Sequence, residues 1–143
     1  MAFITRNPIL RETAHTLAPT TLLYALYVQF HGDYGPGGGF QAGVIFSVGL
    51  ILYALTYGIE KAQTVLSRRT AEVLSAFGVL LYALTGVASL LRGAAFLDYS
   101  VLAQQPLSGQ HIGIFAIELG VGVTIVGVVM LVFYLLTDAG EPA

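Results

Sequence analysis

Four long runs of apolar residues, separated by short polar segments, dominate the chain. The runs cover approximately residues 8–30, 40–59, 73–91 and 111–136. A helix needs about 20 mostly apolar residues to cross the hydrocarbon core of a bilayer. The runs are continuous and lack the apolar–polar alternation of a membrane β-barrel. The pattern therefore predicts an all-α integral membrane protein, with four transmembrane helices in a single domain that comprises residues 1–143.

The composition supports the bilayer as the surrounding medium. Of the 143 residues, 56% are hydrophobic and 10% are charged, and the mean hydropathy is +0.79. Soluble domains carry about 25% charged residues, and a soluble fold of this length could not bury so much apolar surface. The net charge of −2 and the absence of a basic patch argue against nucleic acid as a partner.

The first run is the weakest of the four. Its uniformly apolar part covers only residues 17–30, and Pro19 lies inside it. Asn7 is the expected N-cap, with Pro8 at the first helical position, where a missing N–H is harmless. An amphipathic arm that leads into a short helix is the alternative interpretation of this segment.

The basic residues predict an orientation. Five of them fall on one side of the predicted spans, and one falls on the other: Arg6, Arg11, Lys61, Arg68 and Arg69 against Arg92. Short cytoplasmic segments carry an excess of Lys and Arg. We therefore expect a multi-pass protein of the plasma membrane with both termini in the cytoplasm. The glycine-rich loop between the first two runs would then face outward.

That loop reads HGDYGPGGGFQAG and covers residues 31–43. No Lys follows its glycines and no βαβ unit surrounds them, so nucleotide binding is excluded. A tight turn would explain some of the glycines, and close helix packing along a small-residue ridge would explain more. A direct role in an ion path is the third interpretation. The candidate loop and packing residues are Pro36, Gly37, Gly38, Gly39, Phe40 and Gly43.

Glu118 lies several residues inside the fourth apolar run. A carboxylate at the centre of a bilayer costs about 2.5–3.5 kcal/mol and normally faces protein or water. It is interpreted either as a cation-binding or proton-relay group, or as a structural hydrogen-bond acceptor. His111 precedes it on the same helical face, about 10 Å along the axis. Both are candidates for an ion path, and a basic partner group would have to come from another chain.

His15 is the third candidate for the ion path. Pro19 removes the hydrogen-bond donor that would satisfy the carbonyl of residue 15. Local hydrogen bonding at the membrane surface is the alternative role of this histidine. The three scattered histidines and the lack of Cys predict no metal site. The sequence also offers no nucleophile–base pair, so we expect no catalytic residues, no cofactor and no enzymatic activity.

The loop motif PGGGF, followed by QAG and an apolar helix, resembles the MnhB-like component of Mrp-type multisubunit Na+/H+ antiporters. The resemblance extends from about Arg11 to Leu136 and includes the segment ELGVGVTIVG. It implies a hetero-oligomeric membrane complex that exchanges cytoplasmic Na+ for external H+. In that complex the MnhB-like component is a small companion that packs beside larger ion-translocating subunits. Our interpretation of Glu118 adds the expectation that the chain lines part of the ion path.

Two alternatives remain open from the sequence. MnhB-like components also occur in membrane-bound hydrogenases and complex-I-related respiratory complexes, so the chain could connect the membrane parts of such an assembly. A self-assembling small channel or scaffold is the second alternative, in which copies of the same chain would cover its glycine-rich surfaces.

Overall fold

The computed structural model describes residues 8–32 and 35–139, and the regular structure in these residues is all helical. The predicted fold class is confirmed to that extent. The elements are α2 (Pro8–His31), α3 (Gly39–Tyr57), α4 (Ile59–Val65), α5 (Arg68–Leu91), the 3-10 turn η1 (Tyr99–Leu102) and α6 (Pro106–Ala139). Arg6 and Asn7, to which the sequence assigns roles in orientation and capping, lie outside the described residues.

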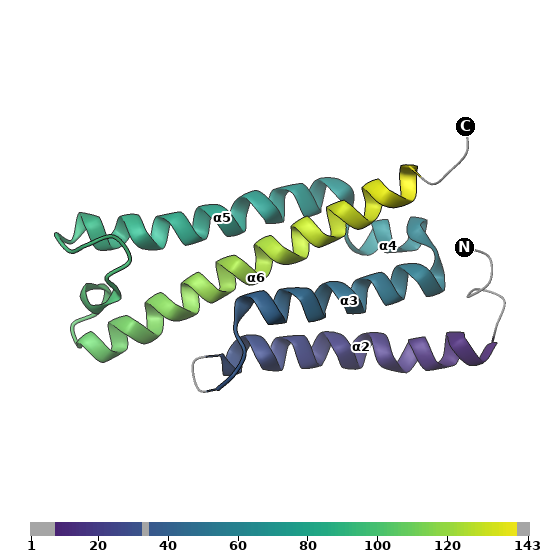
Figure 1. Cartoon of the computed structure of the whole chain (residues 1–143), viewed down its shortest axis with the longest axis horizontal. Coiled ribbons are helices and arrows are strands. Elements are labelled where there is room, and N and C mark those ends of the chain that lie inside the picture. Colours follow the sequence, from purple (N-terminus) through teal and green to yellow (C-terminus); the bar gives the residue numbers. More distant parts are fainter. Residues whose placement is uncertain (1–7, 33–34, 140–143) are drawn as a thin grey trace.

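The four long helices lie side by side in the order α5, α6, α3, α2 (Figure 1). Helix α6 runs obliquely between α5 and α3, and α2 packs mainly on α3. The connection through η1 extends further along the long axis than the connection between α2 and α3 (Figure 1). The arrangement is therefore an open layer, with a step where the shorter α2–α3 hairpin ends.

Three of the described helices are long and apolar enough to cross a membrane: Gly39–Tyr57, Arg68–Leu91 and Pro106–Ala139. Helix α2 is not among them, although its 24 residues are sufficient in length. Its sequence mixes polar residues such as Glu12, His15 and Gln29 with the apolar ones. Length and composition thus support three of the four predicted spans.

Several helix ends differ from the predicted boundaries. The second span ends at Tyr57 because Gly58, with φ 97°, turns the chain into the short helix α4. Helix α5 begins at Arg68, five residues before the predicted start. Ser67 caps this helix, since its side chain accepts a hydrogen bond from the Thr70 amide at 3.1 Å. Helix α6 begins at Pro106, a favoured first position for proline.

Small residues fill the contacts between helices, and large apolar side chains face outward. A Cβ atom on Gly120 of α6 would lie 2.8 Å from the carbonyl oxygen of Gly78 in α5. Large exposed side chains include Leu91, at 83% exposure. Close approach through small residues is typical of helix packing in lipid, where apolar surface has no reason to be buried.

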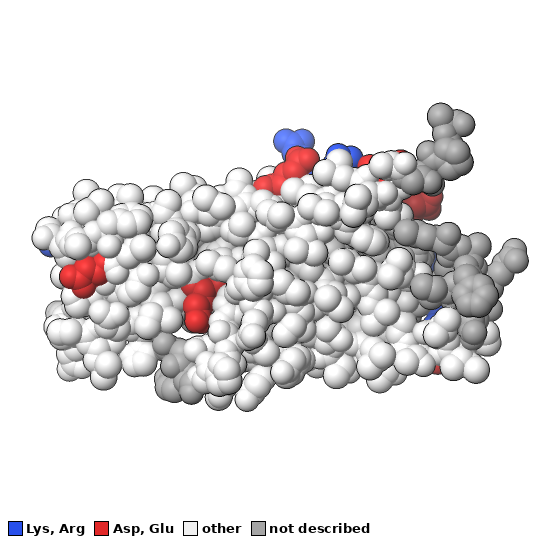
Figure 2. Space-filling view, in the orientation of Figure 1, with Lys and Arg blue, Asp and Glu red and all other residues white. Residues whose placement is uncertain are grey.

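The end of the molecule that carries α4 has a small hydrophobic core. Met130 and Tyr134 are fully buried there, and the Tyr134 hydroxyl donates a hydrogen bond to the Leu66 carbonyl at 2.7 Å. Arg68 forms an ion pair with Asp138 at 3.0 Å. Charged side chains gather over this end of α5 and at the opposite tip, while most of the intervening face is uncharged (Figure 2).

Candidate functional site

The glycine-rich connection between α2 and α3 closes around Glu118 of α6. A Cβ atom placed on Gly32 would lie 2.6 Å from Oε2 of Glu118, and one on Gly38 would lie 2.9 Å from Oε1. Neither position has room for a side chain while the carboxylate stays where it is. An acidic surface patch is visible on this flank, near the α2–α3 connection (Figure 2).

The first turn of α3 lies directly on the backbone of α6. Gly39 approaches the carbonyl group of Glu118 so closely that a Cβ atom would overlap it. One turn later, a Cβ atom on Gly43 would lie 2.7 Å from the carbonyl oxygen of Gly122. Gly38, which precedes the helix, has φ 124°, a conformation that other residues rarely adopt. Backbone contacts thus fix the position of Glu118 relative to the loop.

Two helix ends meet at the Glu118 carboxylate. Helix α2 ends one residue before Gly32, and α3 begins one residue after Gly38. The first N–H groups of a helix carry partial positive charge, and its last carbonyls carry partial negative charge. The N-cap residue of α3, Gly38, has no side chain that could cap the helix, so a nearby carboxylate is favoured there. In transporters with broken helices, the N-terminal ends face anionic groups and the C-terminal ends coordinate Na+ or H+ inside the membrane.

Glu118 lies well inside α6. It is the thirteenth residue of that helix, about 18 Å from its start, and it is half-buried. One turn earlier, the Phe115 ring stacks on Phe30 of α2, with ring centroids 5.9 Å apart. This aromatic contact ties the end of α2 to α6 beside the carboxylate.

The other loop candidates have different surroundings. Gly37 packs against Val28, and a Cβ atom placed on Gly37 would lie 3.3 Å from Cγ1 of Val28. Pro36 is exposed in the loop, and Phe40 on α3 is 62% exposed. Of the predicted loop residues, Gly38 and Gly39 reach Glu118, whereas Pro36 and Phe40 face outward.

The two histidine candidates lie on different helices, both at exposed positions. His111 is exposed, two turns before Glu118 on α6. His15 is exposed near the opposite end of the α2–α3 hairpin, where it lines a cavity of about 330 Å³ with Pro19 and Tyr53. The three residues proposed for an ion path therefore occupy three separate places.

Two residues near the site were not selected from the sequence. His31, at the end of α2, stacks its ring on Tyr27 with centroids 5.1 Å apart. Gln29 is buried, with an exposed fraction of 7%, and a Cβ atom on Gly122 would lie 2.6 Å from its Oε1. The signal for Gln29 is a single amide in the apolar run LLYALYVQF. Among the described residues, no cluster of three or more His, Asp or Glu is suited to a metal ion.

The part of the chain that resembles known proteins includes this site. Residues 9–131 match the family model described as "Domain related to MnhB subunit of Na+/H+ antiporter". The chain is 33% identical over 131 residues to the B-type component of the Na(+)/H(+) antiporter of Bacillus subtilis (strain 168), covering 84% of this chain and 91% of that protein. A protein of Staphylococcus aureus (strain Newman), named as the antiporter component mnhB2, is 32% identical over 127 residues, covering 87% and 89%.

The matched range runs from α2 through most of α6 and includes both the glycine loop and Glu118. The resemblance based on PGGGF and the fourth apolar run is confirmed. The chain belongs to the family of membrane domains related to the MnhB subunit of Na+/H+ antiporters.

Proposed function

We propose that this chain is a small plasma-membrane subunit of a multisubunit Na+/H+ antiporter. It packs beside larger ion-translocating subunits and lines part of the ion path with Glu118. The family assignment supports the antiporter, because relatives that cover most of the chain are named as antiporter subunits. The observation that carries the ion-path role is the Glu118 carboxylate, enclosed by Gly32 and Gly38 between the ends of α2 and α3.

The physical argument concerns the free energy of an acid inside a membrane. A carboxylate in a transmembrane helix is costly, so it faces protein or water and often serves a transport path. In residues 8–32 and 35–139, every Lys and Arg is exposed, and none lies in the middle of α6 beside Glu118. Partner subunits therefore supply the remaining groups of the route. This division of roles describes a companion subunit rather than an enzyme.

The proposed topology has four transmembrane helices, with α2 as the fourth. Helix α2 is about 36 Å long, enough to cross the hydrocarbon core, and it packs along α3. Its outer surface presents exposed Leu23, Tyr24, Tyr27 and Phe30. Lys61, Arg68 and Arg69 lie in or beside α4, and the positive-inside rule supports a cytoplasmic location for that end. Both termini are then cytoplasmic.

Purification of the tagged full chain from its native membrane tests this function. The expected result is a stable set of different membrane proteins that, in vesicles, couples a Na+ gradient to proton movement. Recovery with iron–sulfur or hydrogenase proteins would contradict the antiporter and favour the respiratory alternative. Recovery of the chain alone, as a monomer or homo-oligomer without transport, would also contradict the proposal.

A further inference from the structure

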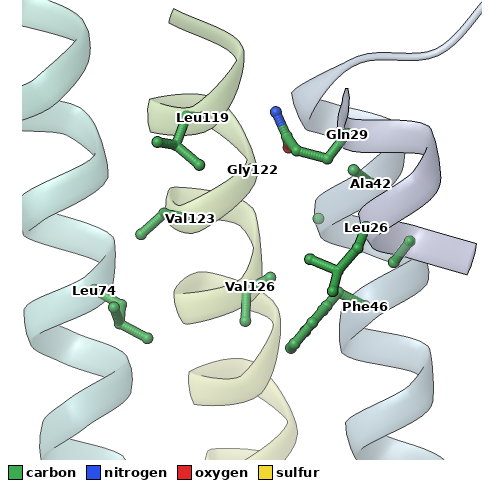
Figure 3. A pocket seen from close by; sticks show the side chains of 11 residues that line it. Leu26, Gln29, Ala42, Phe46, Leu74, Leu119, Gly122, Val123 and Val126 are labelled. Carbon is green, nitrogen blue, oxygen red and sulfur yellow. The ribbon is translucent and has the colours of Figure 1, made fainter. Parts of the chain in front are cut away.

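A groove runs over the surface of α6 between α5 and the α2–α3 hairpin, and we call it the α6 groove. Its floor is formed by Leu119, Gly122, Val123 and Val126 of α6 (Figure 3). Leu74 of α5 lies on one side, and residues of α2 and α3 lie on the other, among them Leu26, Gln29 and Phe46. Its volume is about 200 Å³.

Gln29 makes this groove unusual. Of the described residues that line the groove, Gln29 alone has a polar side chain. It is 7% exposed, and its Nε2 makes no hydrogen bond with any described residue. Figure 3 shows the amide directed into the gap between α6 and the α2–α3 hairpin. A buried amide donor is normally paired, because leaving it unpaired loses the hydrogen bonds it would make with water.

The chemistry of the groove restricts what can occupy it. A lipid acyl chain would fill the apolar surface, but it has no hydrogen-bond acceptor for Nε2. A buried water usually needs two to four polar partners, and the side chains of the groove offer only Gln29. The occupant therefore combines an apolar body with an oxygen acceptor, as a helix with a Ser, Thr, Asn, Gln or acidic side chain does.

We propose that a transmembrane helix of another subunit lies in the α6 groove and accepts a hydrogen bond from Gln29 Nε2 through a side-chain oxygen. This inference rests on the proposed role in a hetero-oligomeric complex. The accessible part of the lining includes Leu26, which is 44% exposed, so an apolar helix finds apolar side chains to pack against. A second copy fits less well, because a two-fold contact would set two concave grooves against each other.

The groove also places the partner helix beside the carboxylate. Leu119, in the floor, follows Glu118 directly in α6. Gly122, which contacts Gln29, lies one turn further along the same helix. A helix in this groove would thus bring its own side chains within about one turn of the Glu118 carboxylate. Partner groups of the ion route would enter at this point.

The substitution Gln29→Leu tests the hydrogen bond in the full chain, co-expressed with the other subunits. If a partner accepts from Nε2, the variant leaves that acceptor unpaired, and recovery of partner subunits falls at least about fivefold. The chain itself stays at its normal level in the membrane. Gln63→Leu, on the exposed surface of α4, is the matched control and leaves recovery unchanged. Unchanged or increased recovery with Gln29→Leu would overturn the proposal, because removing an unpaired amide favours a lipid-facing groove.

A photo-crosslinking amino acid in place of Leu26 provides a measurement that does not depend on the stability of the complex. Leu26 lines the groove and is 44% exposed. The expected product is a covalent adduct with a different membrane subunit. Adducts with lipid alone, or with a second copy of this chain, would overturn the groove assignment even in a complex with Na+/H+ exchange. An adduct with a partner in a complex that contains redox proteins would support the groove and contradict the antiporter role.

Discussion

Close contacts at glycines join α6 to its neighbours at two places, one with the turn η1 and one with the loop between α2 and α3. Near the start of α6, Gly113 faces the ring of Tyr99 in η1, and Gly109 faces the backbone of the same turn. Further along, Gly32 and Gly38 of the loop face the Glu118 carboxylate. The first contact joins the connection through η1 to α6 with an aromatic ring. The second places an ionisable group between two helix ends, so the same kind of close glycine contact holds an aromatic ring in one place and a carboxylate in the other.

The two contacts also differ in what would have to move to admit a side chain. Gly113 meets Cβ, Cγ and Cδ1 of Tyr99, so the four-residue turn η1 that carries this side chain would have to shift. Gly39, at the start of α3, meets the backbone of Glu118, which cannot move without α6. The loop contact is therefore the more rigid of the two, and substitutions at the two glycines should have unequal effects.

The largest expected effect comes from Gly39→Ala, which forces α3 away from α6. We expect a loss of about 3 kcal/mol in the free energy of unfolding, at the upper end for overpacked sites. Gly113→Ala is the matched variant, and we expect it to cost about 1 kcal/mol because the short turn η1, which carries Tyr99, can shift more easily than helix α6. Thermal unfolding followed by circular dichroism in detergent measures both. Equal losses would show that the two contacts are alike in rigidity.

A second pair of variants separates backbone strain from contact with the carboxylate. Gly38 and Gly58 both have positive φ, at 124° and 97°, but a Cβ atom on Gly58 would meet nothing within 4 Å. Alanine at either position costs about 1–2 kcal/mol of backbone strain. Only Gly38→Ala also displaces Glu118, so we expect antiport to fall about tenfold in that variant alone. Normal antiport by a well-assembled Gly38→Ala complex would contradict this distinction.

The α4 end of the molecule provides a reference far from both contacts. Tyr134→Phe removes the hydrogen bond to the Leu66 carbonyl and leaves that buried oxygen unpaired. The expected loss is about 1–2 kcal/mol of unfolding free energy. Transport should be unchanged, because this end does not touch the Glu118 site. A transport defect at normal complex levels would place the α4 end in the ion route.

The smallest expected effect concerns Tyr99. Burial raises the pKa of the Tyr99 phenol above its ordinary value of 10.0, and the charge of Tyr82 raises it further. The neutral phenol is therefore favoured in the folded protein, so stability is constant below pH 10 and falls as the pH rises through the shifted pKa. Absorbance titration should show that the amplitude of the late-titrating phenols decreases in Tyr99→Phe. Titration of Tyr99 together with the exposed tyrosines would contradict this environment.

The sequence predicted the helices well where hydropathy alone decides. The apolar runs located α3, α5 and α6, and the lack of apolar–polar alternation excluded a barrel. The boundaries failed where local chemistry extends a helix beyond its apolar part. Ser67 caps α5 before a mostly polar first turn, and Pro106 starts α6 ahead of its apolar run. Helix α4 was missed because Gly58 breaks an apolar run that has no polar boundary there.

The candidate site was predictable only in its parts. Glu118 and the glycines were identified separately, because a buried acid and a cluster of glycines are unusual wherever they occur. Their meeting depends on contacts between residues about 80 positions apart, which local periodicity does not encode. His111 was grouped with Glu118 because both share one face of a helix. In the structure Gly32 and Gly38 of the loop lie against the Glu118 carboxylate. Gln29 was not selected, because it is a single amide in an apolar run.

Transport by the Glu118→Gln complex is the most direct test of the central claim that the loop holds an ion-handling carboxylate. The amide keeps the size of the side chain but can neither bind a cation through its charge nor exchange a proton. Na+-dependent proton movement in vesicles should fall at least about tenfold, a change of about 1.4 kcal/mol in the barrier, while subunit recovery stays normal. Glu72→Gln, at an exposed position of α5, should retain activity. Full activity of the Glu118→Gln complex would contradict the account and leave Glu118 a structural acceptor.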